Sequence, residues 1–376
     1  MKLKISKIGL NTPTAFIGLY TTFILGKVYF IAENNVLFSI VDGLQWMFLL
    51  FFAFKLLSRK YSVKLLCILF FVVALFGISY YHCKTSSYLK FALIIVASFG
   101  LNYDNFYRDI KQTFMLWGIP LLLLGIVGLI PSTIVRRGYS TYGFVHTNVV
   151  AMFVLTAICC FVMERDGKLT RRNYLFIFLI DILLWFLTDT RSSCVIIIVL
   201  LLINAFLQTR LFSKVIGFKL VKIIIYSLIP LATIFSFYCA INYGSDNVLI
   251  DVMNKMTSNR INMANIVFTR MTPTLFGNYI IGDLVENAYI VSIYQYGIIA
   301  SALVYLFYVY ALGQTIKNKK FGVLSVLICF IIHGIIEAST FEPFVNVALV
   351  PIVFSINLSK FKTKGKKNDN NIYSYL

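Results

Sequence analysis

Apolar runs of about 20 residues, divided by short polar breaks, extend along nearly the whole chain. Of the 376 residues, 59% are hydrophobic and only 13% are charged. A soluble domain of this length could not cover so much apolar surface from water. A helix of about 20 apolar residues, by contrast, matches the hydrocarbon thickness of a bilayer. The sequence therefore predicts an all-α, polytopic membrane protein that forms one integral membrane domain over residues 1–376.

About twelve of these runs are apolar enough to be transmembrane helices. They cover residues 13–32, 36–57, 64–81, 88–103, 112–131, 145–163, 173–188, 191–207, 221–241, 286–313, 321–338 and 342–358. The last two runs are separated only by the break EASTFEP, so the alternative for them is one re-entrant pair. The sequence predicts a helical bundle with short connections on both sides of the membrane.

The positions of the basic residues predict how this bundle is oriented. If the N-terminus is cytoplasmic, 25 of the 34 Lys and Arg residues fall in cytoplasmic segments, as the bias of basic residues toward that side requires. Both termini are then cytoplasmic, and residues 359–376 form a basic cytoplasmic tail. The net charge of +19 is spread over these short connections, which argues against a surface that binds nucleic acid.

Two longer connections fall on the outer side: residues 132–144, and residues 242–285, which form the large extracytoplasmic loop. Arginines in these connections and in the turn TDTRSS depart from the charge bias, and an anionic partner on that side would explain them. A guanidinium group binds phosphate oxygens through a planar, bidentate fork. For Arg191 the alternative is a salt bridge to Asp189 or another carboxylate. The candidate phosphate-binding residues are Arg136, Arg137, Arg191, Arg260 and Arg270.

The segment DVMNKMTSNRINMANIVFTR, residues 251–270 of the large outer loop, is expected to form an amphipathic helix on the membrane surface. Its apolar residues Val252, Met256, Met263 and Val267 have the spacing of one helical face. Arg260 then lies at or near the polar edge. Such a helix could act as a lid over the outer ends of the membrane helices, or it could be a passive surface element.

Three residues near the outer ends of predicted helices are candidates for proton transfer. Glu286 begins a span, Asp283 lies one helical turn before it, and His146 stands with Asn148 at the mouth of another helix. A general base must come within hydrogen-bonding distance of the hydroxyl that it deprotonates. No metal-ligand spacing occurs, so the predicted chemistry needs no metal. Two further acids flank the last outer turn, Glu337 and Glu342.

Three segments share this outer placement: YGFVHTN, TDTRSS, and the run from RINMANIVF through FGNYIIGD to ENAYIVSIYQYGII. In this order they resemble the Wzy-type polysaccharide polymerases of the O-antigen ligase and polymerase superfamily. That family commonly has GF-x-HPN, a turn ending in SR, and R-x-x-x-x-x-A followed by G-x-G and HN-x-Y. Here Thr147 replaces the proline, and Glu286 replaces the histidine of ligase-like members. The second change points to Glu286 or Asp283 as the base.

The resemblance implies a metal-independent glycosyltransferase on the outer face of the bacterial cytoplasmic membrane. Its donor is a glycan on undecaprenyl diphosphate, and its acceptor is a hydroxyl of another lipid-linked repeat unit. The five arginines are then expected to surround the diphosphate, with Glu286, Asp283 and His146 as the catalytic residues and no cofactor. A flippase and a chain-length regulator are candidate protein partners. The expected sugar contacts are Tyr142, Asn148 and Tyr289.

Other functions remain open at this stage. A ligase would transfer the finished glycan from the same lipid carrier to another acceptor, and the sequence does not identify the acceptor. A flippase for the same lipid-linked unit can also have twelve spans, but it should show two similar halves and polar residues in a central cavity. A structural scaffold would leave the outer arginines without a role.

Overall fold

Helices make up all the regular secondary structure of the residues that the computed structural model describes, which are 12–57, 63–98, 105–134, 139–188, 190–245, 247–280 and 286–350. Two isolated β-bridges, Val28–Phe144 and Ile134–Ser140, join loops. The N-terminal helices are α1 (Thr12–Leu25), α2 (Tyr29–Glu33), α3 (Asn35–Leu57), α4 (Val63–Cys83), α5 (Ser87–Ser98) and α6 (Phe106–Ile126).

The second half of the chain contains both long and short helical elements. They are α7 (Thr147–Glu164), α8 (Arg171–Thr188), α9 (Arg191–Leu207), α10 (Arg210–Val215), α11 (Lys219–Ile241), α12 (Val248–Met256), α13 (Arg260–Arg270), α14 (Ala288–Val291), the π-helical turn η2 (Ser292–Tyr296), α15 (Ile298–Lys317), α16 (Phe321–His333) and the 3-10 turns η3 (Ala338–Phe341) and η4 (Val347–Leu349).

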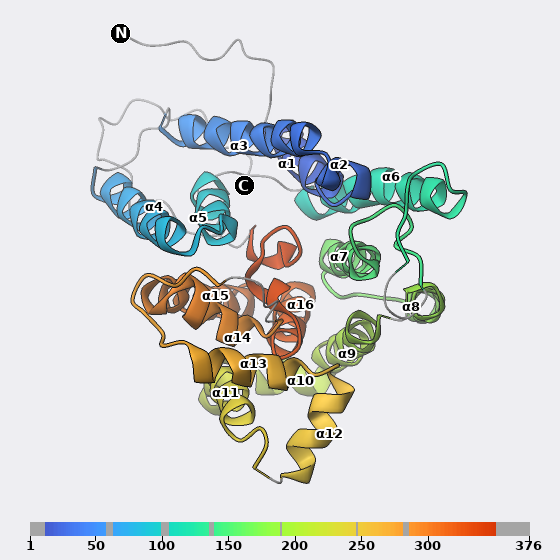
Figure 1. Ribbon diagram of the computed structural model, residues 1–376. Helices are drawn as coiled ribbons and strands as arrows, with labels where there is room; N and C mark the ends of the chain where they lie inside the picture. The colour runs from blue at the N-terminus through green and yellow to red at the C-terminus, as the bar shows by residue number, and fades with distance from the viewer. Residues whose placement is uncertain are drawn as a thin grey trace, which may run out of the picture.

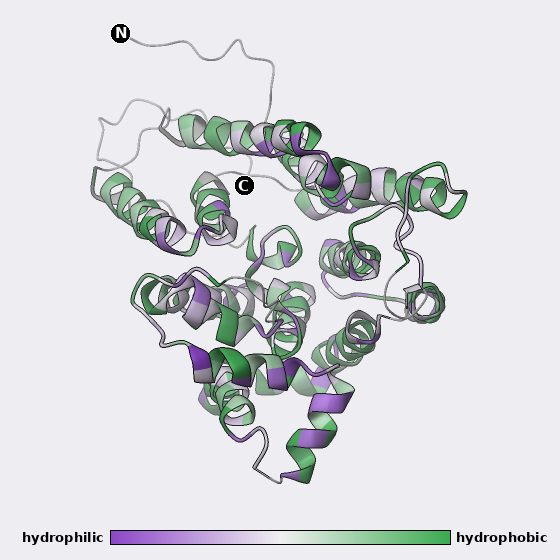
Figure 2. Cartoon of the chain, in the orientation of Figure 1, coloured by the Kyte–Doolittle hydropathy of each residue, from purple (hydrophilic) through white to green (hydrophobic). Residues whose placement is uncertain are grey.

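Six of the described helices are long and apolar enough to cross a membrane: residues 35–54 of α3, 66–83 of α4, and all of α6, α7, α11 and α15. Their outward faces are apolar, with Phe70, Leu116 and Leu231 among the exposed side chains (Figure 2). The chain is thus a helical membrane protein, as predicted. The expected count of about twelve spans remains a prediction.

Several predicted spans are shorter or interrupted in the structure. The run 286–313 is divided into α14, the turn η2 and α15, and the run 321–338 forms only the 13 residues of α16. At 1.5 Å per residue, α16 extends about 20 Å, which is less than the hydrocarbon thickness of a bilayer. Residues 338–341, at the break between the last two runs, form the turn η3, and residues 342–350 of the twelfth run form short buried turns that include η4. Residues 351–358 of that run lie outside the described residues.

Helix α16 lies in the middle of the molecule (Figure 1). It packs against α7, α9, α11 and α15, and the turn η4 packs on α7 and α16. Most residues of α16 are buried, which is why its sequence is apolar on every face. Helices α1, α3 and α6 form a row along one side, with α4 and α5 next to it. The short central element is therefore surrounded by the longer helices.

The connections between helices meet at two opposite ends of the bundle. At one end, Asn204 donates to the carbonyl of Gly167 at 2.9 Å, and Gln208 donates to that of Asp166 at 3.0 Å. The backbone N–H of Gly322 donates to the Asp166 carboxylate at 3.3 Å. These contacts join connections that are rich in Lys and Arg. The other end contains the segments that follow α8, α13 and α16.

The predicted amphipathic helix at 251–270 is present as two helices, α12 and α13. The break occurs because Ser258 and Asn259 both adopt left-handed backbone conformations, with φ of 57° and 68°, which a continuing helix cannot contain. The Asn254 side chain supports the break by accepting from the backbone N–H of Asn262 at 3.0 Å. Helix α12 exposes an apolar face formed by Val248, Leu249, Val252 and Met256, whereas α13 packs on α11.

Candidate functional site

Arg260 is held between two carboxylates. Its Nη2 lies 2.8 Å from Oε1 of Glu337, and its guanidinium also forms an ion pair with Glu286. The Arg260 side chain is only 11% exposed, and that of Glu337 is 16% exposed. A charge this far from water needs close partners of opposite sign. The three residues therefore form one interdependent charged cluster.

The local structure around α13 explains why Arg260 points inward. Asn259, in its left-handed conformation, makes Arg260 the first residue of the helix. The buried face of α13 then contains Arg260, Ala264 and Val267, which are spaced by one and two helical turns. Asn265 fastens this helix to the end of α11 by donating to the carbonyl of Ala240 at 2.7 Å. The arginine is thus placed by a helix break and a packed helix face.

Glu337 is placed by the end of α16 and by the start of α9. Its backbone N–H donates to the carbonyl of His333 at 2.8 Å, which continues the last turn of α16. Ser192, in the first turn of α9, donates its hydroxyl to Oε1 of Glu337 at 2.7 Å. One carboxylate oxygen of Glu337 therefore accepts from both Ser192 and Arg260, so its position is determined from two sides.

Glu286 is positioned by its neighbour Asn287. The Asn287 side chain accepts from the backbone N–H groups of Tyr289 and Ile290, at 3.0 Å each, and so caps the short helix α14. Its amide nitrogen also donates to Ser236 at 3.0 Å and to the carbonyl of Ile335 at 2.9 Å. These four bonds fix the backbone next to Glu286 between α11 and the end of α16.

A cavity of about 470 Å³ lies on one side of the charged cluster. We call it the Arg191 cavity. Its walls come from the beginning of α7, the end of α8, the beginning of α9 and the break between α12 and α13. The charged and polar groups that line it include His146, Asn148, Arg191, Ser192, Arg260 and Glu286. Two guanidinium groups therefore line a single cavity at the end of the bundle opposite to the basic connections.

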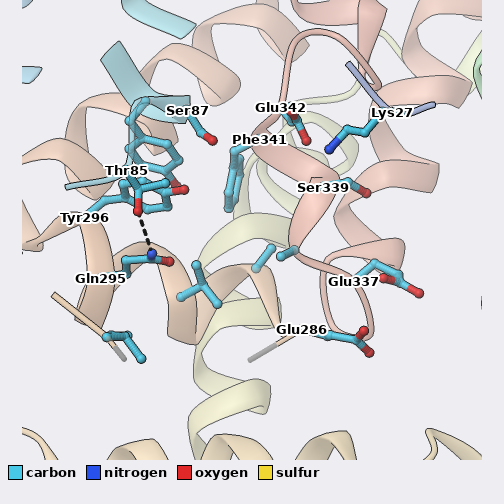
Figure 3. Close-up of a pocket in the computed structure, with 15 residues that line it drawn as sticks. Lys27, Thr85, Ser87, Glu286, Gln295, Tyr296, Glu337, Ser339, Phe341 and Glu342 are labelled. Carbon is cyan, nitrogen blue, oxygen red and sulfur yellow. Dashed lines mark hydrogen bonds between the residues drawn. The ribbon is translucent and has the colours of Figure 1, made fainter. Parts of the chain in front are cut away.

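A second cavity, of about 580 Å³, lies on the other side of the cluster (Figure 3). We call it the Glu342 cavity. It lies between the α4–α5 connection, the turn η2 and the segment that follows α16. Glu286 lines both cavities. The polar residues around the second cavity include Lys27, Thr85, Gln295, Glu286, Glu337 and Glu342.

The environment of Glu286 changes its acidity. Burial raises the pKa of its carboxyl, and the nearby charge of Glu337 raises it further, while Arg260 and His146 act in the opposite direction. The net direction is upward, because burial has the largest effect on this carboxyl. Glu286 lies in the connection before α14, outside the membrane-crossing helices. A carboxylate with a raised pKa accepts a proton more readily than an ordinary glutamate does.

No protein-family model, curated protein or solved structure matches this chain. The function must therefore be inferred from the residues that the fold brings together.

The structure brings five of the predicted site residues to the Arg191 cavity. They are His146, Asn148, Arg191, Arg260 and Glu286. His146 also has a structural role, since its Nδ1 accepts from the backbone N–H of Asn148 at 3.1 Å and caps α7. Thr190 donates to the Asn148 side chain at 3.5 Å, which links the beginnings of α7 and α9.

Three predicted residues lie apart from these cavities. Arg270 is exposed at the far end of α13, ten residues or about 15 Å along the helix from Arg260. Tyr142 donates its hydroxyl to the carbonyl of Leu187 at 3.0 Å and lines neither cavity. Tyr289 is fully buried, with its hydroxyl donating to the carbonyl of Ile331 at 2.7 Å. Its ring packs against protein, so the expected sugar contact is replaced by a structural role.

Arg136, Arg137 and Asp283 lie outside the described residues, so their predicted roles remain predictions. The sequence reading did not include Ser192 or Gln295 among the site residues, and it noted Glu337 and Glu342 only as further acids. Ser192 follows Arg191 directly in the turn TDTRSS, so its proximity to the site could have been expected. Nothing local to Gln295 indicates that it lines a cavity, because the turn η2 that places it depends on distant packing.

Proposed function

We propose that this chain is a glycosyltransferase of the Wzy type, which joins undecaprenyl-diphosphate-linked oligosaccharide repeat units into a capsular or exopolysaccharide chain. The proposed location is the outer face of the bacterial cytoplasmic membrane. The observation that supports the proposal most directly is the charged cluster of Arg260, Glu286 and Glu337. It places a guanidinium group suited to a diphosphate beside a carboxylate suited to general-base catalysis, and Arg191 adds a second guanidinium group to the same cavity.

The Arg191 cavity offers a binding place for the diphosphate of the donor. Arg191 and Arg260 both line it, and guanidinium groups bind phosphate oxygens through charge-assisted hydrogen bonds. Negative charge grows on the leaving diphosphate as the glycosidic bond breaks. Preorganised cations lower the free energy of that transition state more than that of the bound substrate. The lipid tail would extend from the cavity along the apolar helix surfaces.

The ion pair between Arg260 and Glu286 suggests how donor binding activates the base. A diphosphate next to Arg260 competes with Glu286 for the same guanidinium. When the diphosphate takes over that interaction, Glu286 loses its counter-ion, and its carboxylate becomes more basic. Glu337 keeps Arg260 in place, since it is also held by Ser192. The proposed base therefore becomes active only when the leaving group is in position.

The proposed reaction transfers one glycosyl group. The oxygen of an acceptor hydroxyl forms a bond to the anomeric carbon of the donor, and Glu286 accepts the hydroxyl proton. The bond between the anomeric carbon and the diphosphate oxygen breaks, and its electron pair leaves with undecaprenyl diphosphate. Glu286 then releases the proton to water. This cycle needs neither an oxidant nor a reductant, and both substrates are lipid-linked repeat units.

The proposed function is tested with cells that lack this chain. Lipid-linked single repeat units on the outer leaflet are the expected result, and the wild-type chain should restore the polymer. Long glycans that remain on the lipid carrier would instead indicate a ligase. Units that stay on the cytoplasmic leaflet would indicate a flippase. Glu286→Gln should reach the membrane at wild-type level and restore no polymer.

The proposed orientation is tested separately by labelling exposed cysteines in whole cells. Tyr279 lies at the end of the bundle that contains the site, and Asn318 lies at the basic end; both are exposed. A membrane-impermeant thiol reagent should label Tyr279→Cys in intact cells and Asn318→Cys only after lysis. Cys67, the one native cysteine that is exposed, is replaced by serine in both variants. The reverse labelling result would put the site on the cytoplasmic side.

A further inference from the structure

The Glu342 cavity is separate from the Arg191 cavity. Its lining comes from the α1–α2 connection, the α4–α5 connection, the turn η2 and the segment after α16. Lys27 and Glu342 point toward each other at one side of it, and Gln295 and Thr85 face it from another (Figure 3). With a volume of about 580 Å³, it is large enough for one or two sugar rings.

The polar groups of this cavity are those that bind sugar hydroxyls. Gln295 donates its amide to the Thr85 hydroxyl at 3.0 Å, which orients the amide and leaves its carbonyl oxygen as an acceptor. Glu342 is half-buried and, within the described part of the chain, has no hydrogen-bond or ion-pair partner for its carboxylate. The stacked rings of Tyr88 and Tyr296, with centroids 3.7 Å apart, form a rigid wall beside these groups. Carboxylate, amide and hydroxyl groups on a rigid frame suit a ligand with many hydroxyls.

The charge of the Glu342 cavity differs from that of the Arg191 cavity. Three glutamates, Glu286, Glu337 and Glu342, line it together with a single lysine, Lys27. An excess of carboxylates repels a diphosphate and accepts hydrogen bonds from neutral or amino sugars. The two cavities thus favour opposite ends of a lipid-linked glycan, the anionic head group in one and the sugars in the other.

Glu286 lies at the boundary between these two cavities, because it lines both of them. A hydroxyl that enters from the Glu342 cavity therefore meets the proposed base at the border of the donor cavity. We propose that the Glu342 cavity binds the acceptor saccharide, through sugars that are neutral or basic, while the acceptor's own diphosphate stays outside. This inference rests on the proposed function, and it assigns the acceptor to a cavity separate from that of the donor.

Binding of two separate probes to the purified chain in nanodiscs tests the assignment. The first probe is undecaprenyl diphosphate alone. The second is the lipid-free repeat-unit oligosaccharide, released by mild acid from the lipid-linked units that the deletion strain accumulates. Glu342→Gln and Gln295→Leu should each weaken oligosaccharide binding about tenfold, the difference between a charged and a neutral hydrogen bond or the loss of one such bond. They should leave undecaprenyl diphosphate binding unchanged.

The controls separate this inference from the proposed function. Glu33→Gln makes the same chemical change at an exposed position outside both cavities and should bind both probes like the wild-type chain. Arg191→Gln should weaken the binding of undecaprenyl diphosphate and leave the binding of the oligosaccharide unchanged. If Glu342→Gln and Gln295→Leu bind the oligosaccharide normally, the acceptor assignment is wrong and the proposed function stands. If the wild-type chain binds neither probe, the acceptor assignment and the proposed function are both wrong.

Discussion

Replacing Arg260 by methionine tests whether its guanidinium stabilises the fold by compensating the negative charge of two carboxylates. Methionine keeps an unbranched side chain and removes the charge. Arg260 Nη2 lies 2.8 Å from Oε1 of Glu337, and the same guanidinium pairs with Glu286. At 2.8 Å and an effective dielectric constant of about 20, one pair has a gross Coulomb energy of about 6 kcal/mol. That value is an upper bound for the loss from this pair.

The net loss is smaller because a carboxylate without its partner can take up a proton. Protonating one carboxyl with the ordinary pKa of 4.5 costs about 3 kcal/mol at pH 7. Two adjacent carboxylates can also share a single proton. Arg260→Met should therefore lower the free energy of unfolding by about 3 kcal/mol at pH 7, consistent with the usual cost of breaking a buried ion pair.

The pH dependence of this loss has a definite sign. Without Arg260, the folded-state pKa of Glu286 lies further above that of the unfolded chain, because burial and the charge of Glu337 both raise it. Stability is then present below the unfolded-state pKa and is lost as the pH rises through the folded-state value. The difference between Arg260→Met and the wild-type chain should thus fall below about 1 kcal/mol at pH 4.5, where protonation costs little.

The measurement is reversible unfolding in mixed micelles or nanodiscs at pH 7 and pH 4.5. Arg270→Met is the matched control, because Arg270 is exposed at the other end of the same helix. Its unfolding free energy should stay within about 0.5 kcal/mol of wild type. Equal losses in the two variants, or an Arg260→Met loss that does not change with pH, would refute charge compensation as the role of Arg260.

Two further predictions concern Glu286, the proposed base, and the backbone at Gly297. The proposed chain-joining activity should rise with pH as Glu286, the proposed base, loses its proton. Glu337→Gln should move this rise to lower pH, because it removes a charge that raises the Glu286 pKa. A pH profile that stays unchanged or shifts to higher pH would contradict this. Gly297→Ala should lower the unfolding free energy by at least about 2 kcal/mol, since Gly297 has φ of 93° and an added Cβ would overlap the backbone of Gly277. Gly43→Ala, where an added Cβ meets nothing, should be neutral or stabilising, and a similar loss there would show that glycine geometry is not the cause.

Where a helix depends mainly on its local sequence, its bounds could be predicted to within a few residues. The run 191–207 matches α9, and the run 145–163 differs from α7 by only a few residues. In a bilayer the backbone polar groups must be hydrogen-bonded within the protein, and a helix achieves this within a single segment, so a long continuous apolar run favours a helix. The prediction failed where distant contacts decide the backbone. The run 286–313 is interrupted at Gly297, whose left-handed conformation brings η2 against the loop at Gly277.

The candidate site shows the same division between local and distant causes. Composition and the positions of Lys and Arg indicated, from the sequence alone, a helical membrane protein with arginines apart from the basic connections. The tertiary structure decided the surroundings of Arg260. Arg260, Glu286 and Glu337 come from α13, the α14 entry and the α16 exit, and only the packing of these segments gives the arginine two carboxylate partners. A charge pattern can be read residue by residue, whereas an ion pair between distant segments exists only after the chain has folded.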